Sequence, residues 1–310
     1  MCTKHATTYK DGKPTISNFS LEWCQKAEEN VTRNLQQTED CLFLDVFVPR
    51  AVFENDTEHR CADHALAPIV VSFGTTPFIY GSKAEIGIGG PSPAVLTQHS
   101  AYSDDSCATQ HPIVVSINYR LGMFGWLNGK EGTANLGFWD QRLALEWVRQ
   151  HAQIFGGDRD RITIVGMGSG GGGSAMHQVT AFGGKPNPNP AWYPPDGTTP
   201  FQRAIIMSPN WEFTPDFRGT FQKVMDAATN MTGSAISTIK QLKELPTHAL
   251  MDINRKVVKE APLNHDMFGP MVAGEFVPKH PGVLLRDKQF DPALKVSPGG
   301  PTLALCCIVS

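Results

Sequence analysis

The chain has 310 residues, which is enough to bury a large core in one α/β domain. A content of 41% hydrophobic and 18% charged residues is typical of a soluble globular protein. The net charge of −3 gives no basis for nucleic-acid binding, and no apolar run is long enough to cross a membrane.

The first half of the chain contains three short apolar segments that predict β-strands. Residues 41–48 predict a strand that ends at Pro49, and a polar connection follows at 50–67. The segments 69–73 and 113–117 are apolar and rich in β-branched residues, as buried parallel strands are.

A helix is predicted next, over residues 140–155. Helical spacing places Leu143, Trp147, Ile154 and Phe155 on its apolar side.

After this helix, strands and helices continue to alternate. Strands are expected at 162–165 and 204–207, with a loop rich in Pro, Gly and Asn at 183–200 and short helices at 217–260. The pattern predicts a single domain over 1–310, with a mostly parallel central sheet flanked by helices.

A strand that leads into a glycine-rich turn and then a helix is the most informative feature of the chain. The turn reads Gly166-Met167-Gly168-Ser169-Gly170. Its layout is that of the nucleophile elbow of α/β-hydrolases, Gly-x-Ser-x-Gly, with Gly168 at the nucleophile position. The alternative register makes Ser169 the nucleophile, but Met167 is then too large for the tight side of the turn.

Several ordered segments together resemble the type-B carboxylesterase and cholinesterase family, over roughly residues 20–292. The resemblance implies an α/β-hydrolase fold and ester hydrolysis by a Ser, Asp/Glu and His triad. The segments that carry it are Glu39–Pro49, Asn118–Leu127, Asn135–Val148, Phe155–Asp158, Phe201–Ser208 and Phe268–Pro278.

The chain departs from the family pattern at the loop that forms the oxyanion hole. Where the family has a His-Gly-Gly-Gly-Phe-like loop, this sequence has Thr75, Thr76 and Pro77 before Phe78. Pro77 has no N–H to donate to an oxyanion.

A second departure concerns the acid and the histidine of the triad. In the family the acid follows the segment that here spans 284–290, and the histidine comes much later. This sequence leaves the pattern at 291–310, so we expect a partial domain, truncated at both ends, with a divergent tail. His177 is too close to the elbow in sequence to act as the base, and we expect a packed or solvated helix histidine.

These departures predict a catalytically inactive, carboxylesterase-like domain. The neuroligin-type adhesion members of the family also carry glycine at the nucleophile position. By that resemblance the domain would bind an unknown extracellular protein at the cell surface or outside the cell. The alternative is a serine carboxylesterase that cleaves esters through Ser169. No cofactor is implied.

Other features indicate secretion, although no signal peptide is visible at the N-terminus. The resemblance implies a disulfide between Cys24 and Cys41, while the pairing of the other five cysteines stays open. No cysteine and histidine spacing suggests a metal site. Four Asn-x-Ser/Thr sequons predict glycosylation, at Asn18, Asn30, Asn55 and Asn230.

Overall fold

A computed structural model describes most of the chain as two compact units. The smaller unit joins Met1–Cys41 to Lys223–Met267, and the larger joins Leu42–Gln222 to Phe268–Ser310. The predicted sites Asn18, Cys24, Asn30 and Asn55 lie outside the described residues. The structure describes residues 7–10, 13–16, 38–53, 66–85, 111–129, 132–191, 195–209, 217–261, 267–291, 294 and 303–306.

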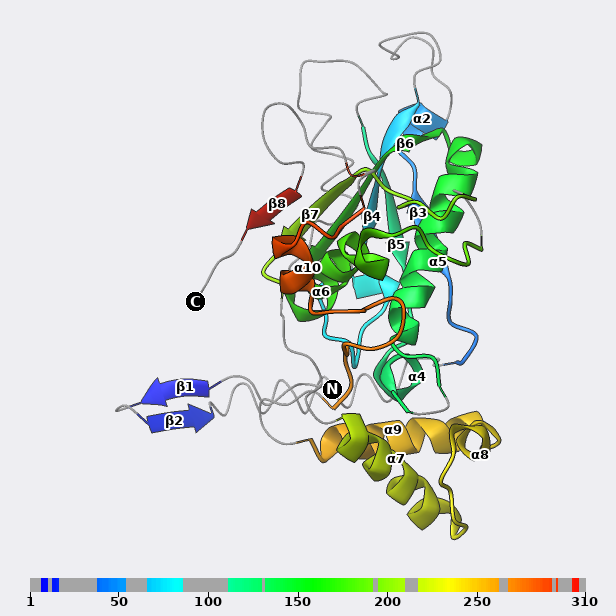
Figure 1. Ribbon diagram of the computed structural model, residues 1–310, viewed down its shortest axis with the longest axis vertical. Helices are drawn as coiled ribbons and strands as arrows, with labels where there is room; N and C mark the ends of the chain where they lie inside the picture. Colours follow the sequence, from blue (N-terminus) through cyan, green and yellow to red (C-terminus); the bar gives the residue numbers. More distant parts are fainter. Residues whose placement is uncertain are drawn as a thin grey trace. The chain divides into compact units, whose positions relative to one another are not determined.

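The larger unit is built on a six-stranded sheet in the order β3-β5-β4-β6-β7-β8 (Figure 1). Strand β3 runs antiparallel to β5, and every other neighbouring pair is parallel. This confirms the mostly parallel sheet. The strands are β3 (Leu44–Phe47), β4 (Ala67–Ser72), β5 (Ile113–Ile117), β6 (Gly157–Met167), β7 (Arg203–Met207) and β8 (Leu303–Cys306).

The strands agree with the sequence prediction most closely at β5 and β7, and least at β6, which is longer at both ends than the predicted 162–165. Strand β5 has the predicted bounds 113–117, and β4 begins two residues earlier than predicted. The first strand is shorter than predicted, because only Leu44–Phe47 pairs with β5. The polar connection that follows it begins with a single helical turn, α2 (Arg50–Phe53).

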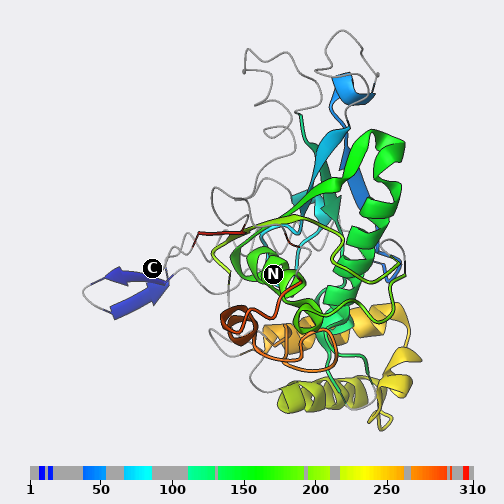
Figure 2. The same cartoon turned by 45° about the horizontal axis from the view of Figure 1, so that its top comes forward.

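Two long helices lie against the sheet. Helices α5 and α6 both pack on β6 and on each other, and α6 also packs on β7. Helix α5 runs beside the sheet in both views (Figure 2). The helical elements of this unit are η2 (Lys83–Glu85), α4 (Gly122–Trp126), α5 (Leu136–His151), η5 (Ala152–Phe155), α6 (Gly168–Val179), η6 (Ala181–Gly184) and α10 (Pro281–Arg286).

The predicted apolar side of the helix over 140–155 is partly wrong. Leu143 is 37% exposed and Ile154 is 80% exposed, whereas Trp147 and Phe155 do pack against the core. Residues 152–155 form the separate 3₁₀ helix η5. The buried side of α5 instead carries Leu145 together with polar side chains that have hydrogen-bond partners elsewhere in the fold. These bonds offset much of the cost of burying them, although Nε of Arg142 has no hydrogen-bond partner among the described residues.

The core between the strands and these helices is apolar and β-branched. Each such buried side chain contributes roughly 1.5–3 kcal/mol to folding. An aromatic cluster beside it joins the segment after β4 to α4, α5 and the chain near 276. The core includes Ile69, Val71, Ile113, Val115, Ile162, Ile164 and Ile206, and the cluster includes Phe78, Trp126, Phe138, Trp139, Phe182 and Phe276.

The smaller unit contains helices and a two-stranded antiparallel sheet. Leu250, Ile253 and Val257 form the buried side of α9, and the sequon residue Asn230 is exposed on α7. Helices α7 and α9 are longer than the predicted short helices. The elements are β1 (Thr7–Lys10), β2 (Lys13–Ile16), α7 (Phe217–Thr232), which begins in the larger unit, α8 (Ile239–Lys243) and α9 (Thr247–Lys259).

In the described part of the chain, no helix has the length and apolar character needed to span a membrane.

Candidate functional site

The predicted elbow lies at the junction of β6 and α6. Met167 ends the strand with an extended backbone, and Gly168 begins the helix with φ at +72°. An L-amino acid at this φ is strained, whereas glycine adopts it freely. Ser169, the alternative nucleophile, is half-buried in the first turn of α6.

Two glycines beside Gly168 leave no space for a side chain. A Cβ on Gly166 would lie 1.9 Å from the carbonyl oxygen of Gly171. A Cβ on Gly170 would lie 1.7 Å from the carbonyl oxygen of Thr76. Both distances are far inside van der Waals contact. Gly166 and Gly170 lie two residues before and two residues after Gly168, as in an elbow centred on that residue. Gly171 and Gly172 exclude a side chain as well, but position 167, which would be the matching position before Ser169, carries Met167.

The structure brings the predicted oxyanion-loop residues against this same turn. The carbonyl oxygen of Thr75 lies 3.0 Å from the position of a Cβ on Gly168. That of Gly74 lies 1.9 Å from the position of a Cβ on Gly171. Three successive carbonyl oxygens, of residues 74–76, thus face the first turn of α6.

Two histidines lie close together at the other end of α6. His177 is buried, and its ring lies 4.5 Å from that of Phe138. Burial, and to a lesser degree the neighbouring His280, lowers the pKa of His177 to about 3. His280 caps α10, and its Nδ1 accepts a hydrogen bond from the backbone N–H of Gly282 at 3.0 Å. His177 is thus a packed core residue.

Two further residues bear on the sequence analysis: Asp291, where the sequence leaves the family pattern, and Cys41, one half of the predicted disulfide. Asp291, which directly follows the segment at 284–290, is buried and accepts a 2.5 Å hydrogen bond from the backbone N–H of Thr199. Cys41 is half-buried, while its predicted partner Cys24 lies outside the described residues, so this disulfide stays a prediction.

A buried hydrogen-bonded group in the second turn of α6 was missed from the sequence. Ser174 accepts a hydrogen bond from Nε2 of Gln141 at 2.8 Å and also bonds to Tyr119. Burial raises the pKa of Tyr119 to about 12, the bond to Ser174 opposing it. A neutral phenol and an amide do not activate a serine, so this group is structural. No motif marks it, because its members come from three distant segments.

A bidentate ion pair fixes the segment after β5 to α5. Arg120 donates from Nε and Nη2 to the two carboxylate oxygens of Asp140 at 2.8 and 2.7 Å. Its backbone N–H also donates to Asp140, at 3.1 Å. This Arg–carboxylate geometry holds the segment in one orientation.

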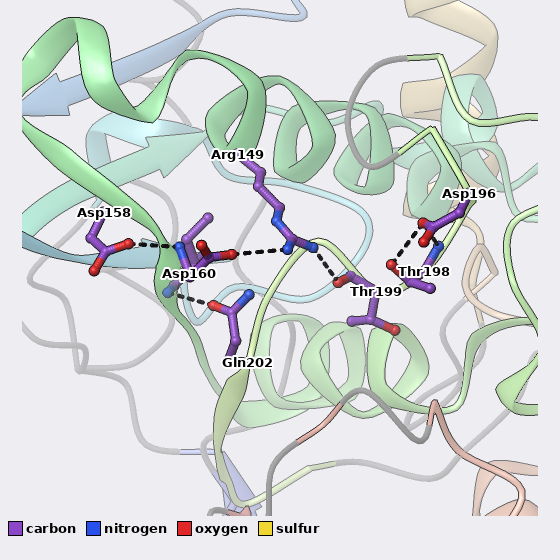
Figure 3. Close-up of polar contacts among 8 residues, drawn as sticks. Arg149, Asp158, Asp160, Asp196, Thr198, Thr199 and Gln202 are labelled. Atoms are coloured by element: carbon purple, nitrogen blue, oxygen red, sulfur yellow. Dashed lines mark hydrogen bonds and ion pairs between the residues drawn. The ribbon is translucent and has the colours of Figure 1, made fainter.

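Polar side chains of α5 also bond to residues 187, 191 and 199, and Figure 3 shows the bond from Arg149 to Thr199. Arg149 donates to the carbonyl oxygen of Thr199 and to Asp160, both at 3.1 Å. Glu146 accepts from Nδ2 of Asn187 at 2.8 Å and from the backbone N–H of Ala191 at 2.9 Å. Three positions within the predicted loop at 183–200 are therefore held by α5.

A small cavity lies behind the oxyanion-loop position. Its volume is about 20 Å³, room for a single water molecule. The lining includes Gly74, Thr75 and Thr76 and no residue of α6; the rest comes from Phe73, 81–83, 116–119 and Leu121. Within the described residues, no three His, Cys, Asp or Glu side chains are grouped so as to hold a metal ion.

Comparison with known proteins identifies the family of the chain. The sequence matches the profile of the carboxylesterase family over residues 2–298. It is 34% identical to carboxylesterase patB of Penicillium expansum, over 90% of this chain and 46% of that protein. It is 32% identical to a secreted lipase of Arthroderma benhamiae, over 70% of this chain and 39% of that protein.

Solved structures show the same fold. A pNB esterase superposes with a TM-score of 0.61 at 24% identity, over 88% of this chain and 47% of that one. Carboxylesterase EST55 of Geobacillus stearothermophilus gives a TM-score of 0.57 at 25% identity, over 81% and 47%. The chain spans less than half the length of these relatives. It belongs to the carboxylesterase family and has the α/β-hydrolase fold.

Proposed function

We propose that this chain is a catalytically silent member of the carboxylesterase family that acts by binding a protein partner outside the cell. The observation that carries the proposal is Gly168. It occupies the turn between β6 and α6 at a positive φ, flanked at two residues on each side by glycines that cannot accept a side chain. With Gly168 at the centre of the elbow, no hydroxyl is present to attack an ester carbonyl. Loss of the nucleophile costs a triad enzyme about 10⁶ in turnover.

The loop at 74–77 supports the same conclusion. An oxyanion needs N–H donors, but Pro77 has none, and the carbonyl oxygens of Gly74, Thr75 and Thr76 face the elbow instead. Removing one donor from an oxyanion hole costs about 10²–10³ in rate. A carbonyl oxygen in place of the donor adds repulsion.

An extracellular location is supported by the four sequons and by the similarity to proteins named secreted lipases. Asn230 is exposed on α7, so its side chain is accessible for attachment of a glycan. The neuroligin-type members give a precedent for adhesion by a domain of this family without a nucleophile.

A fluorophosphonate probe tests the absence of a reactive serine. We expect no labelling of the wild-type chain, and none of a Ser169→Ala control. Labelling of the wild type that disappears in Ser169→Ala would establish the serine carboxylesterase alternative instead.

Restoring the hydroxyl provides a second test. Gly168→Ser should give no p-nitrophenyl ester turnover above background, because Pro77 and the facing carbonyl oxygens remain. The control is Gly168→Ala, which adds the same Cβ without a hydroxyl. Both variants should lose about 1–2 kcal/mol of stability from the positive φ alone. Turnover in Gly168→Ser that is absent from Gly168→Ala would contradict catalytic silence.

The binding role predicts that chain secreted from a eukaryotic host binds saturably to cells. Protease treatment of the cells should abolish this binding, since the proposed partner is a protein. Binding that survives protease treatment, or no saturable binding across a panel of cell types, would count against the role.

A further inference from the structure

The glycine run that opens α6 contacts the loop at 74–77 backbone to backbone. At Gly170 and Gly171, an added Cβ would lie 1.7 Å from the oxygen of Thr76 and 1.9 Å from that of Gly74. At Gly168 the corresponding distance to the oxygen of Thr75 is 3.0 Å. A methyl group does not fit at Gly170 or Gly171, and at Gly168 it fits only if the loop gives by a few tenths of an ångström.

The loop is fixed at both of its ends. Before it, the backbone N–H of Phe73 donates to the carbonyl oxygen of Val165 at 3.1 Å. After it, the carbonyl oxygen of Phe78 accepts from Gly122 at 2.9 Å, and the Phe78 ring lies 4.6 Å from that of Trp126. Gly74 is also held, because its N–H donates to Oγ of Ser72 at 3.2 Å and its carbonyl oxygen accepts from the N–H of Met167 at 3.5 Å. Movement is therefore easiest at residues 75–77.

Behind the loop lies the cavity of about 20 Å³ lined by Gly74, Thr75 and Thr76. Residues 74–77 are half-buried, so the loop also borders solvent. The loop thus has close contact on its α6 side and room for about one water molecule on another side.

We propose that the loop at 74–77 is a closed strap over residue 168, which stays closed because the glycine run of α6 leaves room for it and which moves away from α6 when a side chain is added there. A side chain at Gly170 or Gly171 would then shift the loop and open the elbow, while leaving the sheet and α5 in place. This inference rests on packing alone and not on catalytic silence, and its test does not use fluorophosphonate labelling.

Glycine-to-alanine variants of the full chain, followed by hydrogen exchange, test this strap. The measured quantity is the exchange rate of a peptide covering 73–78, relative to a peptide from β5. We expect Gly170→Ala and Gly171→Ala to raise that ratio about 10-fold or more, since local opening is made easier. In an ordinary helix the same change adds helix propensity and is stabilising.

The matched pair is Gly168→Ala and Gly274→Ala. Both glycines have a positive φ, +72° and +68°, so alanine introduces similar backbone strain. An added Cβ meets the loop oxygen of Thr75 at 3.0 Å in the first case and only the Cβ of Ala134 at 3.8 Å in the second. We expect faster exchange at 73–78 for Gly168→Ala alone, by less than for Gly170→Ala.

Two results would overturn the proposal. One is equal acceleration in Gly274→Ala, because the effect would then be general destabilisation. The other is unchanged exchange at 73–78 in the α6 variants, because the helix and not the loop would then have yielded. If Gly170→Ala and Gly171→Ala fail to fold, the comparison of Gly168→Ala with Gly274→Ala decides.

Discussion

Acid should destabilise this fold through one buried residue, His177. Its pKa is lowered from 6.5 to about 3 in the folded chain, first by burial and to a lesser degree by the neighbouring His280. Above pH 6.5 both the folded and the unfolded states hold it neutral, so it makes no difference to stability. Below pH 6.5 the unfolded state binds a proton that the folded state excludes, and stability therefore falls as pH falls.

The size of this effect follows from the two pKa values. Each pH unit below 6.5 should cost about 1.4 kcal/mol, until the folded-state pKa of about 3 is reached. Between pH 6.5 and pH 5.0 the loss is then about 2 kcal/mol. Below about pH 4 the carboxyls of Asp196 and Asp287, whose pKa values are lowered by hydrogen bonds, lose stabilising charge as well, so the measurement stays above that range.

Urea denaturation followed by tryptophan fluorescence at pH 6.5 and 5.0 measures this loss. His177→Phe keeps an aromatic ring against Phe138 and removes the titrating group, so most of the pH-dependent loss should disappear. His248→Gln is the control, because His248 is exposed on α9 and should leave the loss unchanged. If His177→Phe loses as much stability as the wild type between the two pH values, the assignment to His177 is wrong.

Three further changes should separate buried polar contacts from exposed ones in the same denaturation assay. Asp140→Asn should cost about 3 kcal/mol, because it leaves the bidentate Arg120 without its counter-charge. Arg255→Ala should cost less than about 0.5 kcal/mol, since its 2.6 Å pair with Asp252 is about half exposed; equal losses in these two variants would refute the reasoning. Glu146→Gln should cost about 1–3 kcal/mol and speed hydrogen exchange at 187–191, because Asn187 and Ala191 donate to different carboxylate oxygens and an amide replaces one of these with an NH2 donor. Unchanged exchange there would show that Glu146 does not hold the loop.

The sheet was predictable from the sequence because its central strands are continuous apolar runs. A segment such as 113–117 is buried on both faces of the sheet. It can therefore be predicted as a strand without an alternation of polar and apolar residues and without knowing which strands pair with it. Helix α5 was harder, because periodicity assumes that buried means apolar. Its buried side carries Gln141 and Glu146, whose partners Ser174 and Asn187 lie more than thirty residues away in the chain.

The elbow was predictable for a different reason. Gly166 and Gly170, each two residues from Gly168, indicate a turn in which strand and helix nearly touch. The structure has that turn. The contacts of Gly171 with Gly74 were not predictable, since they depend on where a loop nearly a hundred residues earlier is placed. The burial of His177 was not predictable either, since the sequence is compatible with both a packed and a solvated helix histidine.

The strand order has a consequence for how the chain folds during synthesis. Strand β3 pairs with β5, yet Phe47 and Ile113 are 66 positions apart, and β4 between them in sequence is no neighbour of β3. At about 5–20 residues per second, a ribosome takes roughly 3–13 s to make that stretch. For those seconds β3 exists without its partner strand, with apolar side chains such as Leu44 and Val46 uncovered. A chaperone that binds short apolar segments should therefore associate with this nascent chain before β5 emerges and leave soon after.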